Sequence, residues 1–598
     1  NMNHKILINS PYKINNKSTK SAMTKKWIVK EPISSTLTEP FRSSLKINAT
    51  LATLLMQRGI DTFDAAHAFF RPNLDELHDP FLMKGMRAAV DRLQKAINAE
   101  ESILFFGDYD VDGTTAVALL YSYVGKRYGN IHFYIPDRFK EGYGLSQQGI
   151  DFAKEKGCTL IITLDCGVRS VDLIANAQKD TIDFIVCDHH EPGDTLPPAI
   201  ILNPKQHDCP YPYKELCGAG VGYKLLHAWT LENGWDLEEL YLNLDRVAVA
   251  IGADIVPVTG ENRIMAFHGL RLLNQEKRYC YKILVDNAKR SFPLTLTDVV
   301  FTIAPRINAI GRLDHGSKAV ELMLSENAAE GSDLSNLLEE ANKYRRELDV
   351  EVLEEALEQI KTDPFYLEAM STVVFQPNWN KGVVGIAASR LTEHYYRPTI
   401  VLTENEDGKL AGSARSINTF NIYAALEQCA DLLIQFGGHQ FAAGMTLHKE
   451  NFEAFRKRFD DVCRASLQPG ELVPIEMVDI EIGLGDLFEP DESRNNVPKF
   501  KRILAQMEPH GPGNMKPQFL TKNLYAAEVR LLNESHLKLK VMDTESDVII
   551  DAIGFFMPDK EIFVAEGVPF DLLYTLEINS WKDKQSLQLN IKDIRPTV

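Results

Sequence analysis

Acidic residues and histidines follow four apolar runs in the first half of this chain. The runs, with the polar residues that follow them, are residues 103–107 before Asp108, Asp110 and Asp112, residues 160–164 before Asp165, residues 184–187 before Asp188, His189 and His190, and residues 247–253 before Asp254. Short apolar runs that alternate with helical segments are typical of a parallel sheet built from βαβ units. Because ligands bind where the carboxyl ends of such strands face a crevice, we expect these acids and imidazoles to converge there.

The chemistry of the expected cluster is that of a metal site. Several carboxylates with few imidazoles predict two ions, which is an arrangement of phosphoester hydrolases. Carboxylate oxygens suit Mn²⁺ or Mg²⁺ better than zinc. The eight cysteines form no Cys-x-x-Cys pair. They therefore favour the reduced, buried thiols of a cytosolic protein over a zinc site or a disulfide framework.

Two plainer interpretations of these residues are open. A single Asp after a strand is commonly a helix cap or a turn residue, although recurrence at four run ends argues against coincidence. The spacing Asp108-x-Asp110-x-Asp112-Gly113 also matches the first half of a calcium loop. That loop needs a Glu six residues after its Gly, and position 119 is Leu.

The composition is that of an ordinary globular protein. The chain has 598 residues, 44% hydrophobic and 25% charged, enough for roughly three or four domains. No apolar stretch approaches the roughly 20 residues of a membrane span, and the polar N-terminus lacks a signal core. We therefore expect a cytoplasmic protein with no membrane partner. The first 22 residues are rich in Asn, Lys and Ser and are expected to be disordered, with Met23 as a candidate start.

The net charge of −18 argues against non-specific coating of nucleic acid. A nucleic-acid enzyme remains compatible with this charge, because acids clustered around metals contribute several of the negative charges. Binding would then depend on local basic groups, for which the candidates are Arg138, Lys140, Arg306, Arg312 and Arg415. Any one of these could be an ordinary surface charge, which is the more common role of such residues.

The pattern changes several times along the rest of the chain. Residues 45–100 predict small helices, one of them capped by Thr62. Residues 322–360 predict one or two long helices that join two bodies, with a coiled coil as the alternative. A second αβ domain follows, with Gly-rich turns at residues 412–416 and 437–444 that could cradle phosphates. The C-terminal part consists of short alternating strands, which favours a small barrel such as an OB-fold, a frequent single-strand binder.

These features occur together in a known family. The stretches that carry the likeness are Gly107-Asp-Tyr-Asp-Val-Asp-Gly113, Asp165-Cys-Gly167, Asp188-His-His190, Gly252-Ala-Asp254 and Gly437-Gly-His439. They resemble the motifs of the DHH phosphoesterases. Three further stretches, at 135–145, at 304–312 and the Pro-Gly-Asn segment before the C-terminal strands, resemble the RecJ family, the single-strand-specific 5′-to-3′ DNA exonucleases of bacteria. The likeness runs from about residue 45 to the end.

The resemblance implies a fold and a set of domains. It implies an α/β protein whose parallel-sheet DHH domain is linked by a long helix to a smaller α/β DHHA1 domain, followed by a C-terminal β-barrel of the OB type. The boundaries it implies are a partly disordered N-terminal extension at 1–44, the DHH domain with N-terminal helices at 45–320, the connecting helix at 321–366, the DHHA1 domain at 367–471 and the OB-fold at 472–598.

The implied activity is hydrolysis of single-stranded DNA from its 5′ end, releasing 5′-mononucleotides with the help of two divalent cations, Mn²⁺ or Mg²⁺, in DNA recombination and repair. Implied partners are single-stranded DNA, single-strand-binding protein and a RecQ-type helicase. Two alternatives stay open. One is a DHH phosphoesterase acting on nanoRNA, dinucleotides or bisphosphorylated nucleotides, which would not need the β domain. The other is a replisome scaffold of the same ancestry that has lost its metals.

The resemblance also implies roles for single residues, motif by motif. The implied metal ligands are Asp110, Asp112, Asp165, His189 and Asp254, with Asp165 as the bridge. Asp108 and His190 would support the ions or meet the scissile phosphate, and His439 would enter the site from the second domain. Contacts to the DNA backbone and its 5′ end are implied for Arg138, Arg306, Asn308, Arg312, Ser413, Arg415 and Ser416. One departure is Ala414, where the family pattern has Gly.

Overall fold

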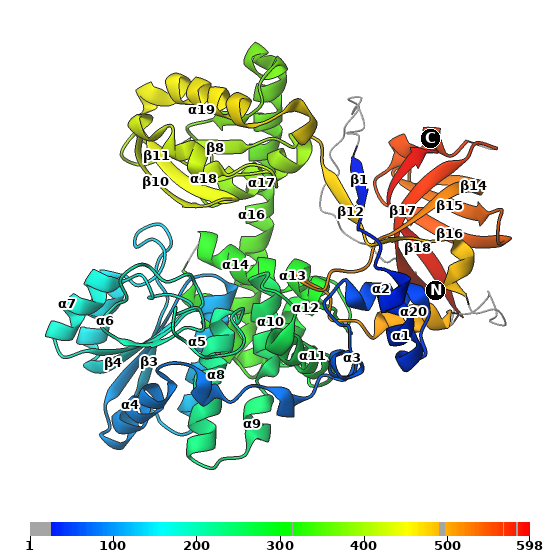
Figure 1. Cartoon of the computed structure of the whole chain (residues 1–598). Coiled ribbons are helices and arrows are strands. Elements are labelled where there is room, and N and C mark those ends of the chain that lie inside the picture. Colours follow the sequence, from blue (N-terminus) through cyan, green and yellow to red (C-terminus); the bar gives the residue numbers. More distant parts are fainter. Residues whose placement is uncertain (1–24, 314, 489–496, 566, 582–583, 598) are drawn as a thin grey trace. The chain divides into compact units, whose positions relative to one another are not determined.

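The structure of this chain, a computed structural model, describes residues 25–597 except 314, 489–496, 566 and 582–583 (Figure 1). The chain divides into two compact units. Unit 1 consists of residues 1–28 and 343–476, and unit 2 of residues 29–342 and 477–598. The predicted disorder of the first 22 residues lies outside the described residues. Across the part of the chain that is described, no helix has the length and apolar character needed to cross a membrane.

A five-stranded parallel sheet forms the centre of the first part of unit 2. Its strands, in spatial order, are β3 (Ile131–Tyr134), β2 (Ser102–Gly107), β4 (Cys158–Leu164), β5 (Asp183–Cys187) and β6 (Ile200–Leu202). Every neighbouring pair is parallel. The first three apolar runs of the sequence are β2, β4 and β5, so their prediction as parallel strands is confirmed.

The direction of strand addition reverses at β2. From β2 the chain crosses to β3 on one side, then returns to β4 on the other side and continues to β5 and β6. In an open α/β sheet such a reversal leaves a crevice beyond the carboxyl ends of the two flanking strands, where ligands bind. Asp108 and Asp165 directly follow β2 and β4, the strands that flank this crevice.

Helices cover both faces of this sheet. Side chains alternate along a strand, so Ile103 and Phe105 of β2 enter one core while Leu104 and Phe106 enter another. The helices of the first core are α4 (Met86–Asn98), α5 (Val111–Gly125) and α8 (Gly218–Glu232), and those of the second are α6 (Gln147–Glu155) and α7 (Val171–Lys179). Burial on both faces explains why the strands are continuous apolar runs.

A helical body completes this part of unit 2. Its members are α9 (Leu237–Tyr241), α10 (Leu244–Ala253), α11 (Gly260–Gln275), α12 (Tyr279–Asn287), α13 (Leu296–Thr302), α14 (Ala304–Leu313) and α15 (Ser317–Leu324). The fourth apolar run was predicted as a strand, and this prediction was wrong, because the run lies in helix α10. Helices α5, α8, α11 and α13 contact α10, so residues 247–252 of the run are buried and apolar around the whole helix. Periodicity cannot distinguish such a helix from a buried strand.

One helix of 35 residues, α16 (Ala328–Thr362), runs from unit 2 into unit 1. The long connecting helix predicted for this region is therefore a single element. Within unit 1 it buries Val352, Ala356 and Ile360 in a core shared with α17 (Val384–Tyr395). These positions are four residues apart, which places them on one face of the helix.

Unit 1 is a mixed sheet between helices. Its strands, in spatial order, are β10 (Leu433–His439), β11 (Ala442–Leu447), β9 (Leu410–Arg415), β8 (Thr399–Glu404) and β7 (Thr372–Phe375). β7 and β8 are parallel, and the other neighbours are antiparallel. Helices α16 and α17 pack on one face, and α18 (Ile422–Glu427) and α19 (Phe452–Ser466) on the other.

The first Gly-rich stretch of unit 1 is mostly strand, so its prediction as a turn was wrong, and the second is a hairpin with its turn at residues 440–441. The predicted contact of both stretches with phosphate stays a prediction. Most of the first stretch lies in β9, where a Cβ on Gly412 would lie 2.3 Å from the carbonyl oxygen of Val401 in the neighbouring strand. The second stretch, residues 437–444, is the hairpin between β10 and β11. Gly412 therefore allows two strands to pack closely, and the backbone groups of both stretches form hydrogen bonds with neighbouring strands of the sheet.

The C-terminal part of unit 2 is a closed five-stranded barrel, as predicted. Its strands, in spatial order, are β14 (Phe519–Leu532), β15 (His536–Asp543), β16 (Val548–Gly554), β18 (Lys584–Pro596) and β17 (Phe570–Trp581). β17 pairs with both β18 and β14, which closes the ring. A short strand, β13 (Ile480–Glu481), adds to β14, and helix α20 (Lys499–Ala505) precedes the barrel.

Three N-terminal helices pack on the barrel and share its apolar core. They are α1 (Ser35–Leu45), α2 (Ala49–Met56) and α3 (Phe63–Phe70). Thr62 caps α3 as predicted, because its Oγ1 accepts a hydrogen bond from the backbone N–H of Ala65. Helix α1 was not predicted. A two-stranded ribbon of β1 (Lys26–Val29) and β12 (Ile475–Val478) is the remaining sheet of the described chain.

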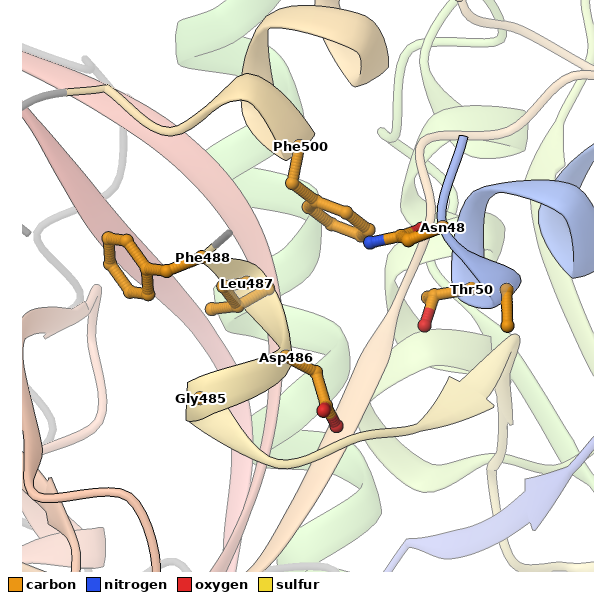
Figure 2. Close-up of a pocket in the computed structure, with 8 residues that line it drawn as sticks. Asn48, Thr50, Gly485, Asp486, Leu487, Phe488 and Phe500 are labelled. Atoms are coloured by element: carbon orange, nitrogen blue, oxygen red, sulfur yellow. The ribbon is translucent and has the colours of Figure 1, made fainter. Parts of the chain in front are cut away.

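A cavity of about 280 Å³ lies where these helices meet the barrel part (Figure 2). Asn48 and Thr50 line it from the start of α2, Asp486 and Phe488 from the segment that precedes the barrel, and Phe500 from α20. Asn48 Oδ1 accepts a hydrogen bond from the N–H of Leu51. None of the strand-end acids lines this cavity, so it belongs to the helix–barrel joint and not to the predicted metal site.

Candidate metal centre

The site begins in the loop between β2 and α5. Asp110 caps α5, with its Oδ1 3.0 Å from the N–H of Gly113. Asp112, in the first helical turn, accepts hydrogen bonds from Gly218 and Ala219 at the start of α8, at 2.6 and 2.7 Å. Asp108 Oδ1 accepts from the N–H of Gly144 at 3.3 Å. Backbone N–H groups therefore hold all three carboxylates in place.

Asp165 follows β4 in a left-handed conformation, with φ of 62°. Its N–H donates to the carbonyl oxygen of Cys187 at the end of β5, at 2.9 Å. The start of α8 lies against its side chain, since a Cβ added to Gly218 would be 2.5 Å from the Cβ of Asp165. Strained backbone of this kind persists where the surrounding structure fixes it, as β5 and α8 do here.

Asp188 shapes the loop that carries the two histidines. Its Oδ1 accepts from the N–H of His189 and from Nδ1 of His190, both at 2.8 Å, and its Oδ2 accepts from the N–H of Val168 at 2.9 Å. Asn203, which follows β6, donates to the carbonyl oxygen of His190 at 2.8 Å. Asp188 thus uses its oxygens to orient this loop.

His189 lies at the centre of the acids. Its Nε2 is 3.1 Å from Asp165 Oδ1, 3.5 Å from Asp254 Oδ2 and 3.9 Å from Asp112 Oδ2. Asp254 reaches this point from the C-terminal end of α10. The predicted convergence of Asp254 with the other acids therefore occurs, although a helix and not a strand delivers it.

Three overlapping groups of side chains could each hold a cation. The groups are Asp108, Asp110 and Asp165; Asp165, His189 and His190; and Asp112, His189 and Asp254, with the ligand atoms of each group within 4.8 Å of one another. The five predicted metal ligands thus lie together, with Asp165 in two of the groups. Asp108 and His190 are beside them.

Several buried polar atoms of this cluster have no hydrogen-bond partner among the described residues. They are Asp108 Oδ2, Asp165 Oδ1 and His189 Nε2. A buried polar group without a partner is costly, and a buried unpaired charge more so. Cations among these atoms would satisfy them, so the residues present fit divalent metal ions.

Burial and crowding raise the pKa of the clustered carboxyl groups. Burial, with Asp110 nearby, raises the pKa of Asp108 to about 8 and that of Asp112 to about 7. Burial, with Asp112 nearby, raises the pKa of Asp254 to about 9 and that of Asp165 well above its usual range. Divalent cations would supply the positive charge that ionised carboxylates need in this place.

The two histidines respond to their surroundings in opposite directions. Burial lowers the pKa of His189 to about 3, so its imidazole is neutral and its Nε2 is available to a metal ion. Burial also acts to lower the pKa of His190, but the hydrogen bond to Asp188 and the charge of Asp188 outweigh it and raise that pKa.

Tyr143 and the start of α8 complete the site, and the sequence analysis missed both. The hydroxyl of Tyr143 lies 2.9 Å from Nε2 of His190 and donates to the carbonyl oxygen of Asp165 at 3.3 Å. Gly142 and Gly144 flank it with φ of 87° and 80°. A tyrosine between two glycines, close to the acidic motif, was the available signal for this residue.

Arg138 lies beside the same loop. Its guanidinium is 4.8 Å from the centroid of the Tyr109 ring. The neighbouring carboxylate of Asp137 has other donors, because its Oδ1 accepts from the N–H groups of Phe139 and Lys140. Arg138 is half-buried at the edge of the metal cluster, which suits the predicted contact with the DNA.

Helix α14 carries the next three predicted contacts. A Cβ on Gly311 would lie 2.9 Å from the carbonyl oxygen of Tyr109, so α14 packs on the loop between β2 and α5. Asn308 and Arg312 are half-buried and one turn apart. The structure therefore places this pair on a helix that borders the acidic cluster.

Arg306 has a partner inside unit 2. Its Nε and Nη2 donate to Glu339 of α16 at 2.5 and 3.2 Å, and its Nη1 donates to the carbonyl oxygen of Thr302 at 2.7 Å. The residue is 6% exposed. This geometry favours a structural role, because a contact with phosphate would require the pair with Glu339 to open.

The remaining predicted residues belong to unit 1. Arg415 Nη1 donates to Ser413 Oγ at 2.7 Å, and a Cβ on Gly385, in the first turn of α17, would lie 3.1 Å from both side chains. Ser416 Oγ donates to the carbonyl oxygen of Phe420. His439 ends β10 and is exposed. Ser413 and Arg415 thus lie together at the start of a helix, an arrangement that suits an anion.

Known families match the chain in the order of its parts. Residues 102–251 match the DHH family, N-terminal domain, residues 368–465 match the DHHA1 domain and residues 493–593 match the RecJ OB domain. The single-stranded-DNA-specific exonuclease RecJ of Bacillus subtilis (strain 168) is 37% identical over 554 residues, which are 92% of this chain and 68% of that protein. This chain belongs to the RecJ family. The domain order implied by the sequence is therefore confirmed.

Solved structures of RecJ have the same fold. RecJ of Thermus thermophilus in complex with Mn²⁺ superposes with a TM-score of 0.81 at 27% identity, over 96% of this chain and 80% of that one. RecJ of the same organism in complex with Mg²⁺ gives a TM-score of 0.74 at 26% identity, over 96% and 79%. The similarity to RecJ thus extends over nearly the whole of this chain.

Proposed function

We propose that this protein is a metal-dependent exonuclease that degrades single-stranded DNA from its 5′ end and releases 5′-mononucleotides, acting in DNA recombination and repair. The observation that carries this proposal is that Asp and His side chains converge beyond the carboxyl ends of the parallel strands. Three of their buried atoms have no hydrogen-bond partner among the described residues. The relatives, named as single-stranded-DNA-specific exonucleases, support the choice of substrate.

The proposed metal ligands are Asp110, Asp112, Asp165, His189 and Asp254, and the ions are two Mn²⁺ or Mg²⁺, as the metal-bound RecJ structures suggest. Asp165 is the proposed bridge. Asp165 and His189 each belong to two of the three ligand groups, and of the two only the carboxylate of Asp165 has two oxygens with which to contact two ions. When bound, two such cations activate a water molecule and stabilise both the attacking and the leaving oxygen of a phosphodiester.

The chain's own groups would orient the substrate and stabilise charge. Asp188 holds Nδ1 of His190 and favours its protonated form, so the charged imidazolium of His190 can stabilise the negative charge that develops on the phosphate. Tyr143 is bonded to the opposite ring nitrogen of His190 and fixes the ring. Asp108 is proposed to support the metal ligands. His439 is proposed to donate a hydrogen bond to the phosphate.

The DNA contacts of this proposal are divided between the two units. In unit 2, Arg138, Asn308 and Arg312 border the acids and would contact the backbone near the scissile bond, with Arg306 as a further contact if its internal pair opens. In unit 1, Ser413, Arg415 and Ser416 are the proposed receptor of the 5′ end. Guanidinium groups suit this role because they bind phosphate through paired, charge-assisted hydrogen bonds.

Single-strand-binding protein and a RecQ-type helicase are proposed partners, because the family acts on strands that such proteins cover and expose. The proposed location is the cytoplasm. All eight cysteines are free and buried in the structure, which suits a reducing compartment.

The test is digestion of one oligonucleotide labelled at either end, with Mn²⁺ or Mg²⁺. We expect the 5′ label to appear at once as a mononucleotide and the 3′ label to remain on progressively shorter strands. Duplex DNA and a metal-free reaction are the controls. Early release of the 3′ label, or equal rates on a dinucleotide and a long strand, would favour a different DHH phosphoesterase.

A further inference from the structure

The strongest unassigned feature is a set of exposed apolar residues on the elements that join the metal centre to the barrel. Asp254, a proposed ligand, is followed by Ile255, which is 64% exposed with φ of 58°. Four residues after Asp254, the N–H of Val258 donates to the carbonyl oxygen of Pro512, in the loop that leads into the barrel, at 2.7 Å. Four residues span at most about 14 Å. The metal centre and the barrel's lead-in loop are therefore close neighbours.

Helix α13 joins the same two places. A Cβ on Gly252, two residues before Asp254, would lie 2.9 Å from Leu296 and 3.6 Å from Val300 of α13. On its other side Leu296 faces the lead-in loop, 3.7 Å from where a Cβ on Gly511 would be. α13 thus packs between the end of α10 and the barrel's lead-in loop.

This helix carries Phe301, whose side chain is 72% exposed. Met515, in the lead-in loop, is 64% exposed. Single exposed apolar residues are common on protein surfaces. Here three large ones, Ile255, Phe301 and Met515, lie on the few elements that join the metal centre to the barrel.

We propose that Phe301 is a stacking platform for the bases of single-stranded DNA between the scissile phosphate and the barrel, with Ile255 and Met515 as further apolar contacts of the strand. This inference rests on the proposed function. Aromatic side chains bind single strands by stacking on the faces of the bases, which does not depend on sequence. The flexible thioether of methionine adapts to different bases. A strand running from the metal centre to the barrel has to cross this junction.

The test compares the KM of the Mn²⁺-dependent reaction for two 5′-phosphorylated thymidine strands. One is intact, and the other carries abasic sites at the second to fourth nucleotides from the 5′ end. Phe301→Ala should raise the KM for the intact strand about tenfold, since stacking contributes strongly per base. Phe301→Trp should restore it. On the abasic strand, wild type and Phe301→Ala should have the same KM.

Leu231→Ala is the matched control, because Leu231 is also exposed but lies near the far end of α8, about 20 Å along the helix from Gly218. An unchanged KM for the intact strand, or a penalty of Phe301→Ala that persists on the abasic strand, would overturn the platform. A wild-type protein that degrades neither strand would overturn the proposed function itself, and the platform with it.

Discussion

Asp112 and Asp165 are the most enclosed carboxylates of the proposed ligand set, at 1% and 2% exposure. The two backbone N–H groups at the start of α8 compensate the cost of burying Asp112, because both donate hydrogen bonds to its carboxylate. Asp165 Oδ1 has no hydrogen-bond donor among the described residues. An ionised carboxylate without compensation is expensive to bury. A cation is thus the compensation that the chain itself does not supply.

The raised pKa values give the metal-free protein a defined pH dependence. Asp112, Asp108 and Asp254 have pKa values of about 7, 8 and 9 when folded, against about 3.9 in an unfolded chain. The folded state binds more protons, so the stability from these groups is fully present below about pH 4, is lost progressively as pH rises, and the loss is complete only above about pH 9. We expect the Tm of EDTA-treated protein to fall over this range, in thermal scans at fixed salt.

Mn²⁺ should largely remove this fall, because bound cations stabilise the ionised carboxylates. The metal-loaded protein in the same buffers is therefore the control. A Tm of metal-free protein that stays level or rises between about pH 7 and 9 would contradict the assigned burial of charge.

Arg138→Ala should selectively weaken recognition of the 5′ end. The guanidinium lies on Tyr109 at the edge of the acids, where it can hold a terminal phosphate by paired hydrogen bonds. We expect the rate on 5′-phosphorylated strands to fall about tenfold or more, with a much smaller change on 5′-hydroxyl strands. Lys140→Ala, in the same loop but exposed and 3.7 Å from Asp137, is the control. Equal losses on both substrates would remove Arg138 from the end-binding site.

The meeting of Asp108, Asp165 and His189 could be predicted, because the carboxyl ends of parallel strands share one edge of a sheet. The contact of Tyr143 with His190 could not, since it depends on the course of a glycine-flanked loop. The pairing of Arg306 with Glu339, 33 residues away, was equally hidden. Sequence indicates which residues follow a strand, but it does not indicate which cation already has a partner.

At the scale of elements, α8 controls the geometry of the site. Its first residues donate to Asp112 and press against Asp165. Gly218→Ala would place a methyl 2.5 Å from Asp165 Cβ, so one of them must move. We expect the affinity for Mn²⁺ to fall about tenfold or more, because a shift of a ligand carboxylate alters coordination. Calorimetric titration measures this.

Gly220→Ala is the matched control on the same helix. Its new methyl would be 3.5 Å from the nearest atom, an ordinary contact, and alanine favours the helix by roughly 0.5–1 kcal/mol. Metal affinity should be unchanged in this variant. Equal Mn²⁺ affinities of the two variants would show that α8 does not position Asp165.

The type of an element could be predicted from sequence where a strand is bounded by turns. The prediction failed where an element is completely buried. Helix α10 is buried by four other helices, so its run 247–253 has no polar residue and has the composition of a buried strand. Strand β9 was predicted as a turn because it contains Gly412 and polar residues. In the structure this glycine allows the close approach of the neighbouring strand at Val401. Both errors come from tertiary packing, which local patterns do not record.

At the scale of the molecule, Arg263 links the helical body of unit 2 to helix α3 and to the segment that precedes the barrel. This residue of α11 is 4% exposed and donates to the carbonyl oxygens of Phe69, Met507, Glu508 and Pro509. Its guanidinium lies 3.8 Å from the centroid of the Phe69 ring. Helices α1 to α3 also share the barrel core, so the barrel is not an independent appendage.

Arg263→Met should therefore destabilise the whole of unit 2. The variant leaves several buried carbonyl groups without donors, at about 1–3 kcal/mol each, and we expect a loss of about 3 kcal/mol or more in denaturant unfolding. Arg271→Met, two turns further along α11 and exposed, should change stability by less than about 1 kcal/mol. Equal effects of the two substitutions would contradict the role of Arg263 as a link.

The count of Mn²⁺ ions bound per chain tests the proposed two-metal centre most directly. Metal-free protein titrated with Mn²⁺ in a calorimeter should bind two ions. Asp165→Ala should bind at most one and lose about 99% or more of strand hydrolysis, because cations without a bridging carboxylate repel each other at short range. Asp172→Ala, exposed on α7, should still bind two. A single ion in the wild type, or two ions and full activity in Asp165→Ala, would contradict this centre.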